Sequence, residues 1–280
     1  MIKNPILLDK IITNALEEDL GPGDITTDSI IGGDITGKAV LETREDIVLA
    51  GLPVFMRVFS ILDSNISFET YYEDGHKVSV GEVICSINGA MASILKAERT
   101  ALNLIQRMSG IATLTSEYVS KAASDKVKIL DTRKTMPGLR LLDKYAVPLG
   151  GGCNHRFGLF DGILIKDNHI AVAGSVKKAV EAARKNAPHG IKVEVEVEDP
   201  DGIKTAIEAG ADVILLDNML PDRMKEAVDF VAGRALLEAS GGISLDNIKE
   251  VAATGVDMIS IGALTHSVKA VDLSLEISGV

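Results

Sequence analysis

The sequence predicts an α/β protein whose larger part is an incomplete parallel barrel. Short apolar runs alternate with amphipathic helical runs from residue 126 onward, and polar residues close three of these runs 21 positions apart, at Glu196, Asp217 and Glu238, with Gly262 following 24 positions later. A strand, a loop and a helix fit this spacing. Hydrophobic residues make up 46% of the 280 residues, which is enough for a sizeable core. Such repeats form a parallel sheet, and a barrel places functional side chains at the carboxyl ends of its strands.

The first part of the chain is predicted to be a separate domain of helices and short strands. Apolar residues recur with a helical period over residues 5–19, and the turn residues Gly21 to Asp24 end that helix. A long helix is expected over residues 92–119, with a break near Gly110. The expected strands between these helices are 39–41, 47–50, 66–71 and 83–84.

The second part contains six strong strand-like runs, which is fewer than the eight of a complete barrel. A Rossmann-type sheet is the alternative, but no G-x-G-x-x-G motif follows a strand. The expected strands are 127–131, 162–166, 192–197, 212–217, 235–239 and 258–262. The expected helices are 176–187, 200–208, 221–231 and 244–254.

Composition excludes several classes of protein. A net charge of -11 argues against a general nucleic-acid binder but allows a local basic pocket for a small anion. Two cysteines, Cys85 and Cys153, cannot form a disulfide framework and suit a reducing cytoplasm. We expect no signal peptide at the N-terminus, and no apolar run is long enough to span a membrane.

Basic residues gather between Asp131 and His169. This segment has six lysines and arginines against four acidic residues, so it is net +2 in an acidic chain. The basic residues are Arg133, Lys134, Arg140, Lys144, Arg156 and Lys166. Cations at strand ends and in the glycine-rich loop 150–152 indicate an anion pocket, and the alternative is a set of ordinary surface ion pairs.

Two carboxylates, Glu196 and Asp217, are expected at neighbouring strand ends. They could hold Mg²⁺, directly or indirectly, or accept hydrogen bonds from ribose hydroxyls. The alternative is structural ion pairing, because Lys192, Glu194, Glu196 and Glu198 share one strand face by their period of two. Pairing with cations such as Lys166 is expected, and Glu194 at least is interpreted as structural.

Small residues close the last two strands, at Ser240-Gly241-Gly242 and at Gly262-Ala263. Each is followed by a helix, and free N–H groups at such a position suit a phosphate. A plain turn is the alternative for each glycine. Cys153 is interpreted as structural because nothing nearby marks an activated thiolate, and His155 and His169 lack the cysteine spacing of a zinc site.

Several of these segments, in order from about residue 15 to 270, resemble motifs of the quinolinate phosphoribosyltransferases. The motifs are Glu18–Thr27, Ala97–Asn103, Arg107–Thr113, Asp131–Thr135, Gly151–Arg156, Leu164–His169 and Gly262–His266. The resemblance implies an N-terminal α/β sandwich over residues 1–112 and an incomplete TIM-like barrel over 113–266. It also implies that a C-terminal helix, 267–280, packs back on the first domain.

The family's reaction transfers the phosphoribosyl group of phosphoribosyl pyrophosphate (PRPP) to quinolinate and releases pyrophosphate and CO2, with Mg²⁺ as cofactor, to give nicotinate mononucleotide for NAD biosynthesis. By this resemblance, quinolinate would contact Arg99, Thr132, Arg133, Lys134, His155, Arg156 and Lys166. Lys134, Lys166, Glu196 and Asp217 would bind the ribose and PRPP, with Glu196 and Asp217 as candidate Mg²⁺ ligands. The phosphate would sit on Ser240, Gly241, Gly242, Ile261, Gly262 and Ala263.

The resemblance further implies a cytoplasmic homodimer, or a higher oligomer, in which Arg99 of one subunit enters the partner's site. Three rival functions stay open at this point. One is a paralogue of the molybdenum-transport-associated type with another acceptor. The others are a different phosphate-binding barrel enzyme, such as an isomerase or lyase, and a non-catalytic binding protein on the same fold.

Overall fold

The computed structural model describes residues 4–31 and 35–279, which form two compact units. Unit 1 comprises the described residues up to Ser116 together with 136–151 and 267–279, and unit 2 comprises Glu117–Thr135 and Gly152–His266. The division differs from the predicted one because the first boundary lies after Ser116 instead of residue 112, and because residues 136–151 belong to unit 1.

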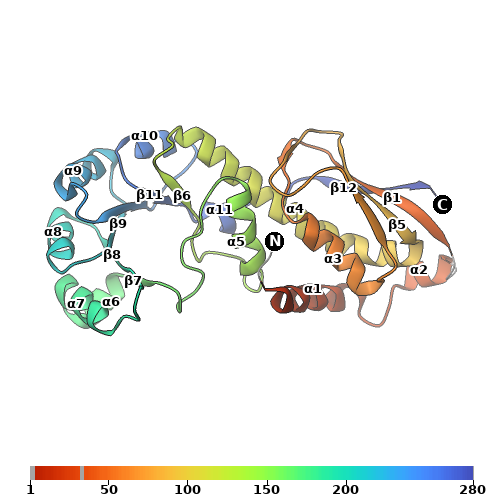
Figure 1. Ribbon diagram of the computed structural model, residues 1–280, viewed down its shortest axis with the longest axis horizontal. Coiled ribbons are helices and arrows are strands. Elements are labelled where there is room, and N and C mark those ends of the chain that lie inside the picture. Colours follow the sequence, from red (N-terminus) through yellow and green to blue (C-terminus); the bar gives the residue numbers. More distant parts are fainter. Residues whose placement is uncertain (1–3, 32–34, 280) are drawn as a thin grey trace. The chain divides into compact units, whose positions relative to one another are not determined.

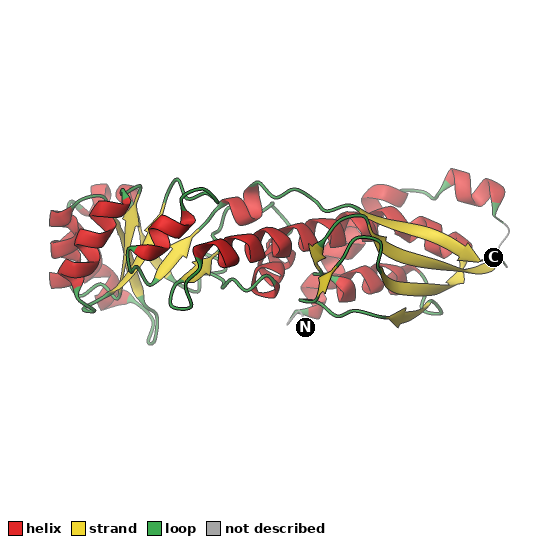
Figure 2. Ribbon diagram, turned by 90° about the horizontal axis from the view of Figure 1, so that it is seen from above, coloured by secondary structure: helices red, strands yellow, loops and turns green. Residues whose placement is uncertain are grey.

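Unit 1 is built on an antiparallel sheet whose strand order is β12-β1-β5-β3. Strands β2 and β4 form a second, two-stranded sheet. The strands are β1 (Thr36–Thr43), β2 (Ile47–Val48), β3 (Ser67–Thr70), β4 (Lys77–Val78), β5 (Val83–Ala90) and β12 (Leu273–Gly279). The helices are α1 (Pro5–Leu20), α2 (Ile25–Ile30), α3 (Leu52–Leu62), α4 (Met91–Ala122, with the part from Glu117 onward in unit 2) and α5 (Arg140–Leu149). Apolar faces of the helices and the sheet share one buried core, and Figure 2 shows the helices alongside the strands.

Local chemistry explains where the first helices begin. The Asn4 side chain accepts a hydrogen bond from the Leu7 amide, and Pro5 supplies a first helical residue that needs no amide donor. Asp24 caps α2 in the same way by accepting from the amide of Thr27. The predicted helix at 5–19 is confirmed, whereas α2 was not predicted.

Helix α4 runs for 32 residues without the break that was expected near Gly110. A helical glycine is destabilising by roughly 1 kcal/mol relative to alanine, so its presence calls for a packing reason. A Cβ atom at Gly110 would lie 2.3 Å from the backbone oxygen of Lys269. Gly110 therefore allows the C-terminal segment of unit 1 to approach the helix.

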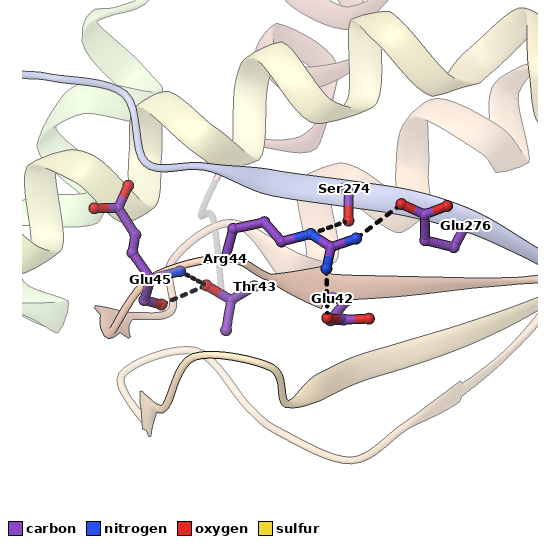
Figure 3. Close-up of polar contacts among 6 residues, drawn as sticks. All are labelled: Glu42, Thr43, Arg44, Glu45, Ser274 and Glu276. Atoms are coloured by element: carbon purple, nitrogen blue, oxygen red, sulfur yellow. Dashed lines mark hydrogen bonds and ion pairs between the residues drawn. The ribbon is translucent and has the colours of Figure 1, made fainter.

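The prediction of a C-terminal helix over 267–280 is wrong. The described residues form strand β12, which pairs antiparallel with β1. Leucine and isoleucine at 273, 275 and 277 alternate with polar residues, and this period of two is typical of a strand. Arg44, just after β1, joins the two strands by contacting Glu42, Ser274 and Glu276 (Figure 3).

Unit 2 contains a six-stranded parallel sheet in the order β6-β11-β10-β9-β8-β7. The strands are β6 (Lys128–Leu130), β7 (Ile163–Ile165), β8 (Val193–Val197), β9 (Val213–Asp217), β10 (Leu236–Ser240) and β11 (Met258–Ser260). Because the last strand pairs with the first, the sheet curls into a barrel, and among the described strands β6 and β7 do not pair. The incomplete barrel is thus confirmed.

Cys153 pairs with β6 through its backbone. Its amide donates to the oxygen of Ile129, and its own oxygen accepts from Asp131, which makes an isolated parallel bridge with β6. Both cysteines are free thiols. The structural interpretation of Cys153 agrees with this backbone role.

Helices follow the barrel strands and lie outside them, as Figure 1 shows for α7 to α10. The helices of unit 2 after α4 are α6 (Asp167–Ala173), α7 (Val176–Asn186), α8 (Pro200–Glu208), α9 (Pro221–Val231), α10 (Ile248–Ala253) and α11 (Ala263–His266). Four match predicted helices, although α10 starts four residues later than expected, after a turn in which Asn247 accepts from the Ser244 amide. No described helix is both long and apolar enough to cross a membrane.

Candidate functional site

A cavity of about 790 Å³ lies at the carboxyl ends of the strands in unit 2. Every residue predicted for the site lines this cavity except Arg99. They are Thr132, Arg133, Lys134, His155, Arg156, Lys166, Glu196, Asp217, Ser240, Gly241, Gly242, Ile261, Gly262 and Ala263. Segments from all around the barrel therefore converge on one volume, within the size range of small-molecule sites.

Arg99 belongs to unit 1. It is an exposed residue of helix α4. Its predicted contact with quinolinate would be made in a partner's cavity, so it stays a prediction.

Four cations, Arg133, Lys134, Arg156 and Lys166, line the cavity. The half-buried Arg156 donates from Nη1 to the oxygen of Gly162 at 2.9 Å. Burial lowers the pKa of Arg156, and the nearby positive charge of Arg133 lowers it further. Like charges brought together in this way repel each other, and an anionic ligand would relieve that repulsion.

Lys134 is held by its backbone. The hydroxyl of Thr265 donates to the Lys134 oxygen at 2.9 Å, and a Cβ atom at Gly262 would lie 2.9 Å from Cδ of Lys134. The glycine after β11 therefore makes room for the aliphatic part of this lysine, which is a role that the sequence did not reveal.

Two carboxylates end the neighbouring strands β8 and β9. Glu196 forms an ion pair and hydrogen bond with Lys166, and Asp217 accepts from Nδ2 of Asn218 at 2.7 Å. Oxygen donors of this kind are those that Mg²⁺ prefers, so the residues fit the cation that was predicted here. The structural alternative for Glu196, an ion pair with Lys166, is also present, and the two roles are compatible if the lysine shares the carboxylate with a ligand.

The loop after β10 needs its glycines. Gly241 and Gly242 both have positive φ, +89° and +63°. A Cβ atom at Gly241 would lie 2.2 Å from Oδ1 of Asn218, whose own backbone is in the left-handed region and donates to the Ser240 oxygen. Asn218 thus interlocks two strand ends, which suits asparagine because it tolerates this conformation.

His155, which is partly buried, forms a cluster with the buried carboxyl groups of Glu194 and Glu238. His155 Nε2 is 3.1 Å from Glu194 Oε2 and 3.6 Å from Glu238 Oε2. The His155 amide donates to the buried Asp131 at 2.7 Å, which anchors the histidine to the end of β6. Burial, and then the charge of Glu194, raise the pKa of Glu238 to about 7, while the nearby His155 opposes the rise.

Sequence reasoning missed seven residues that line the cavity. They are Leu164, Leu215, Asn218, Glu238, Ile243, Ser260 and His266. Glu238 had a usable signal, because it continues the 21-residue spacing of Glu196 and Asp217. Leu164, Leu215 and Ser260 sit on strands, and apolar runs do not indicate which of their members face the barrel mouth. Glu194, interpreted as structural, pairs with His155 rather than with Lys166.

The barrel and its cavity define a class of protein. The cavity at the carboxyl ends of the strands combines four cations, the carboxylates Glu196 and Asp217, and two glycine loops. These groups suit a small anionic substrate that carries phosphate. The fold is therefore an antiparallel-sheet domain joined to an α/β barrel, and the barrel has a site suited to a phosphate-bearing substrate.

Comparisons with known proteins narrow the class. Family models for the C-terminal and N-terminal domains of quinolinate phosphoribosyl transferase match residues 111–276 and 24–109. A probable nicotinate-nucleotide pyrophosphorylase [carboxylating] of Bacillus subtilis is 45% identical, with 98% of this chain and 95% of that protein covered. A quinolinate phosphoribosyltransferase [decarboxylating] of Nicotiana glauca is 42% identical over 96% of this chain and 82% of that protein.

Solved structures agree. The crystal structure of NadC from Streptococcus pyogenes has a TM-score of 0.95 at 42% identity and covers 99% of this chain and 98% of that one. This chain belongs to the quinolinate phosphoribosyltransferase family.

Proposed function

We propose that this protein transfers the phosphoribosyl group of PRPP to quinolinate, with loss of CO2, to give nicotinate mononucleotide and pyrophosphate. The observation that carries the proposal is the convergence of four cations, two carboxylates and two glycine loops on one cavity in a chain of this family. Its relatives carry names for this reaction.

Quinolinate bears two carboxylates, and the cation group supplies partners for both. Arg133 and Arg156 offer planar guanidinium groups that can grip a carboxylate by two hydrogen bonds, and Lys134 and Lys166 add point charges. The positive charge of Arg133 disfavours the nearby charge of Arg156, and a bound dianion would offset this repulsion.

Other residues of the same cavity suit the ribose phosphate. Glu196 and Asp217 would accept from ribose hydroxyls, and Ser240 to Gly242 with Ile261 to Ala263 would hold the 5'-phosphate. Glu196 and Asp217 would also hold Mg²⁺, whose chemistry when bound is to offset charge on the leaving pyrophosphate. The protein's part is to bring the ring nitrogen of quinolinate up to C1 of the ribose and to stabilise the charge that develops there.

The new C–N bond makes the ring a pyridinium. The bond between the ring and its 2-carboxylate then breaks, and the electron pair stays on the ring carbon until a proton reaches it. Cations around the remaining 3-carboxylate would keep the ring in place during this step.

We further propose that the protein acts as a cytoplasmic homodimer or higher oligomer, with Arg99 of each subunit completing a partner's site. The exposed position of Arg99 on α4 supports a role outside its own unit, and the two free thiols suit a reducing compartment.

The test mixes purified protein with quinolinate, PRPP and Mg²⁺ and follows nicotinate mononucleotide by mass spectrometry. We expect product only when all three are present, and none when nicotinate replaces quinolinate. No product from protein shown to be folded would refute the proposed function and favour an acceptor other than quinolinate.

A further inference from the structure

The hydrogen bonds of His155 define which of its nitrogens carries the proton. The amide of Arg156 donates to His155 Nδ1 at 2.7 Å, so Nδ1 is an acceptor and has no proton. Nε2 therefore carries the proton of a neutral imidazole, and it lies 3.1 Å from Glu194 Oε2. Both ring nitrogens are engaged inside the protein.

The carboxylates below His155 are deeply placed. Glu194 is 7% exposed and Glu238 1% exposed, and among the described residues Oε1 of each is buried without a hydrogen-bond partner. Buried carboxyl groups are costly unless they have a defined partner, so their retention beside one histidine calls for a specific role.

These residues also separate two cavities. His155, Arg156 and Glu238 line both the substrate cavity and a second one of about 390 Å³, and the second is also lined by Glu194 and by residues at the amino ends of the strands, such as Ile163 and Val213. Arg156 stands on the partition, where Glu194 favours its positive charge.

We propose that Glu194 and Glu238 are positioning residues for the substrate cation Arg156, acting through a neutral His155 whose Nε2–H they accept. Glu194 accepts from Nε2–H of the ring, and Nδ1 of the ring accepts from the backbone amide of Arg156. Glu238, on β10, lies close to the ring. In this role His155 supports the quinolinate site as a neutral hydrogen-bonding ring that also lines the cavity. The proposal rests on the proposed function and assigns roles to two residues that it does not use.

The first arm of the test is kinetic. Glu194→Ala removes the acceptor of Nε2–H, and we expect the KM for quinolinate to rise about 10- to 100-fold, as for a lost hydrogen bond to a charged group. The KM for PRPP should stay within about 2-fold, because the residues that face ribose and phosphate are untouched. Glu194→Gln keeps an oxygen acceptor and should restore most of the loss. Glu198→Ala, at an exposed glutamate just beyond the same strand, is the matched control and should leave both constants unchanged.

The second arm is spectroscopic. The chain has five histidines, so ¹⁵N-histidine labelling with a His155→Gln reference identifies the His155 signals. We expect an unprotonated Nδ1 and a protonated Nε2 in the native protein, and a mixture of tautomers in Glu194→Ala. Glu238→Gln should keep the native pattern, whereas Glu238→Ala should disturb it.

Three results would overturn the proposal. One is a native His155 protonated on Nδ1. Another is an unchanged KM for quinolinate in Glu194→Ala. The third is an equal loss for both substrates that follows a lowered melting temperature, which would mean a merely structural role. If the native protein makes no nicotinate mononucleotide, the proposed function fails, and the ¹⁵N spectra still decide whether the carboxylates set the tautomer.

Discussion

Two clusters in this molecule have the same composition, one basic side chain between two glutamates, and opposite surroundings. In unit 1, Arg44 contacts Glu42 and Glu276 at 2.9 Å each, with side chains that are 44%, 23% and 54% exposed (Figure 3). In unit 2, His155 contacts Glu194 and Glu238, with side chains that are 13%, 9% and 2% exposed.

The difference in burial decides what each cluster does. Exposed ion pairs are screened by water and salt and contribute about 0–1 kcal/mol. In the His155 cluster, burial disfavours the charged form of Glu238, and the charge of Glu194 adds to this, so the pKa of Glu238 rises to about 7. The charges around Arg44 are therefore expected to affect stability little. The environment of His155, where the quinolinate site is expected, changes the protonation of Glu238.

The largest expected effect concerns Glu238 and the pH dependence of stability. Its pKa rises from an ordinary value of 4.5 to about 7 in the folded chain, so the folded state binds more protons between these values. This contribution to stability is complete below pH 4.5 and is lost as the pH rises through about 7. At 1.36 kcal/mol per pKa unit it amounts to about 3 kcal/mol.

Glu238→Gln removes this titration and keeps the shape. We expect urea denaturation to show that the native protein loses more stability than Glu238→Gln between pH 5 and pH 8. Parallel curves for the two proteins would contradict the prediction. A Glu42→Gln variant, in the exposed cluster, is the control and should follow the native curve.

Arg133→Ala tests the functional side of the comparison. The residue lines the cavity and its charge bears on Arg156, so we expect kcat/KM to fall on the order of 10²-fold, about 2.7 kcal/mol. Steady-state kinetics with quinolinate and PRPP would measure the loss. Arg184→Ala, an exposed arginine on α7 that pairs with Asp212, should retain native activity. An unchanged kcat/KM in Arg133→Ala would remove Arg133 from the site.

The barrel could be predicted from sequence because its signals are local. Each strand is a short apolar run, each helix has its own periodicity, and the spacing of Glu196, Asp217 and Glu238 repeats. The division into units could not, since residues 136–151 belong to unit 1 through tertiary packing. The C-terminal strand is a different case. Apolar and polar residues alternate there, which indicates a strand, whereas the family resemblance implies a helix.

The residues of the candidate site likewise include some that the sequence predicts and some that it does not. Cations and glycines at strand ends, and the motifs that carry the family resemblance, were sufficient to name nearly all of the cavity. The network beneath it was not predictable, because the pairing of Glu194 with His155 joins strand β8 to a loop 39 residues away. Periodicity predicts which strand face Glu194 shares with Glu196 but not which side chain it contacts.

Glu196→Gln has an intermediate expected effect. Glu196 pairs with Lys166 at the edge of the cavity that is proposed for PRPP, so the variant should bind quinolinate alone nearly normally and show about 10-fold weaker use of PRPP. Calorimetry with quinolinate and kinetics against PRPP measure the two effects separately. Weakened quinolinate binding would instead mean that the carboxylate mainly positions Lys166.

The smallest expected effect is at Arg44, where the comparison is most easily broken. Arg44→Ala removes both ion pairs and the hydrogen bond to Ser274, yet each partner can turn to water. We expect the free energy of unfolding to fall by at most about 1 kcal/mol, with less effect at high salt, since exposed pairs are screened. Urea denaturation at low and high salt measures this. A loss of several kcal/mol would show that the contact between β1 and β12 depends on charge, and that burial is not what separates the two clusters. The β1–β12 ladder of backbone hydrogen bonds argues for the smaller value, because it holds the C-terminal strand whether or not Arg44 is present.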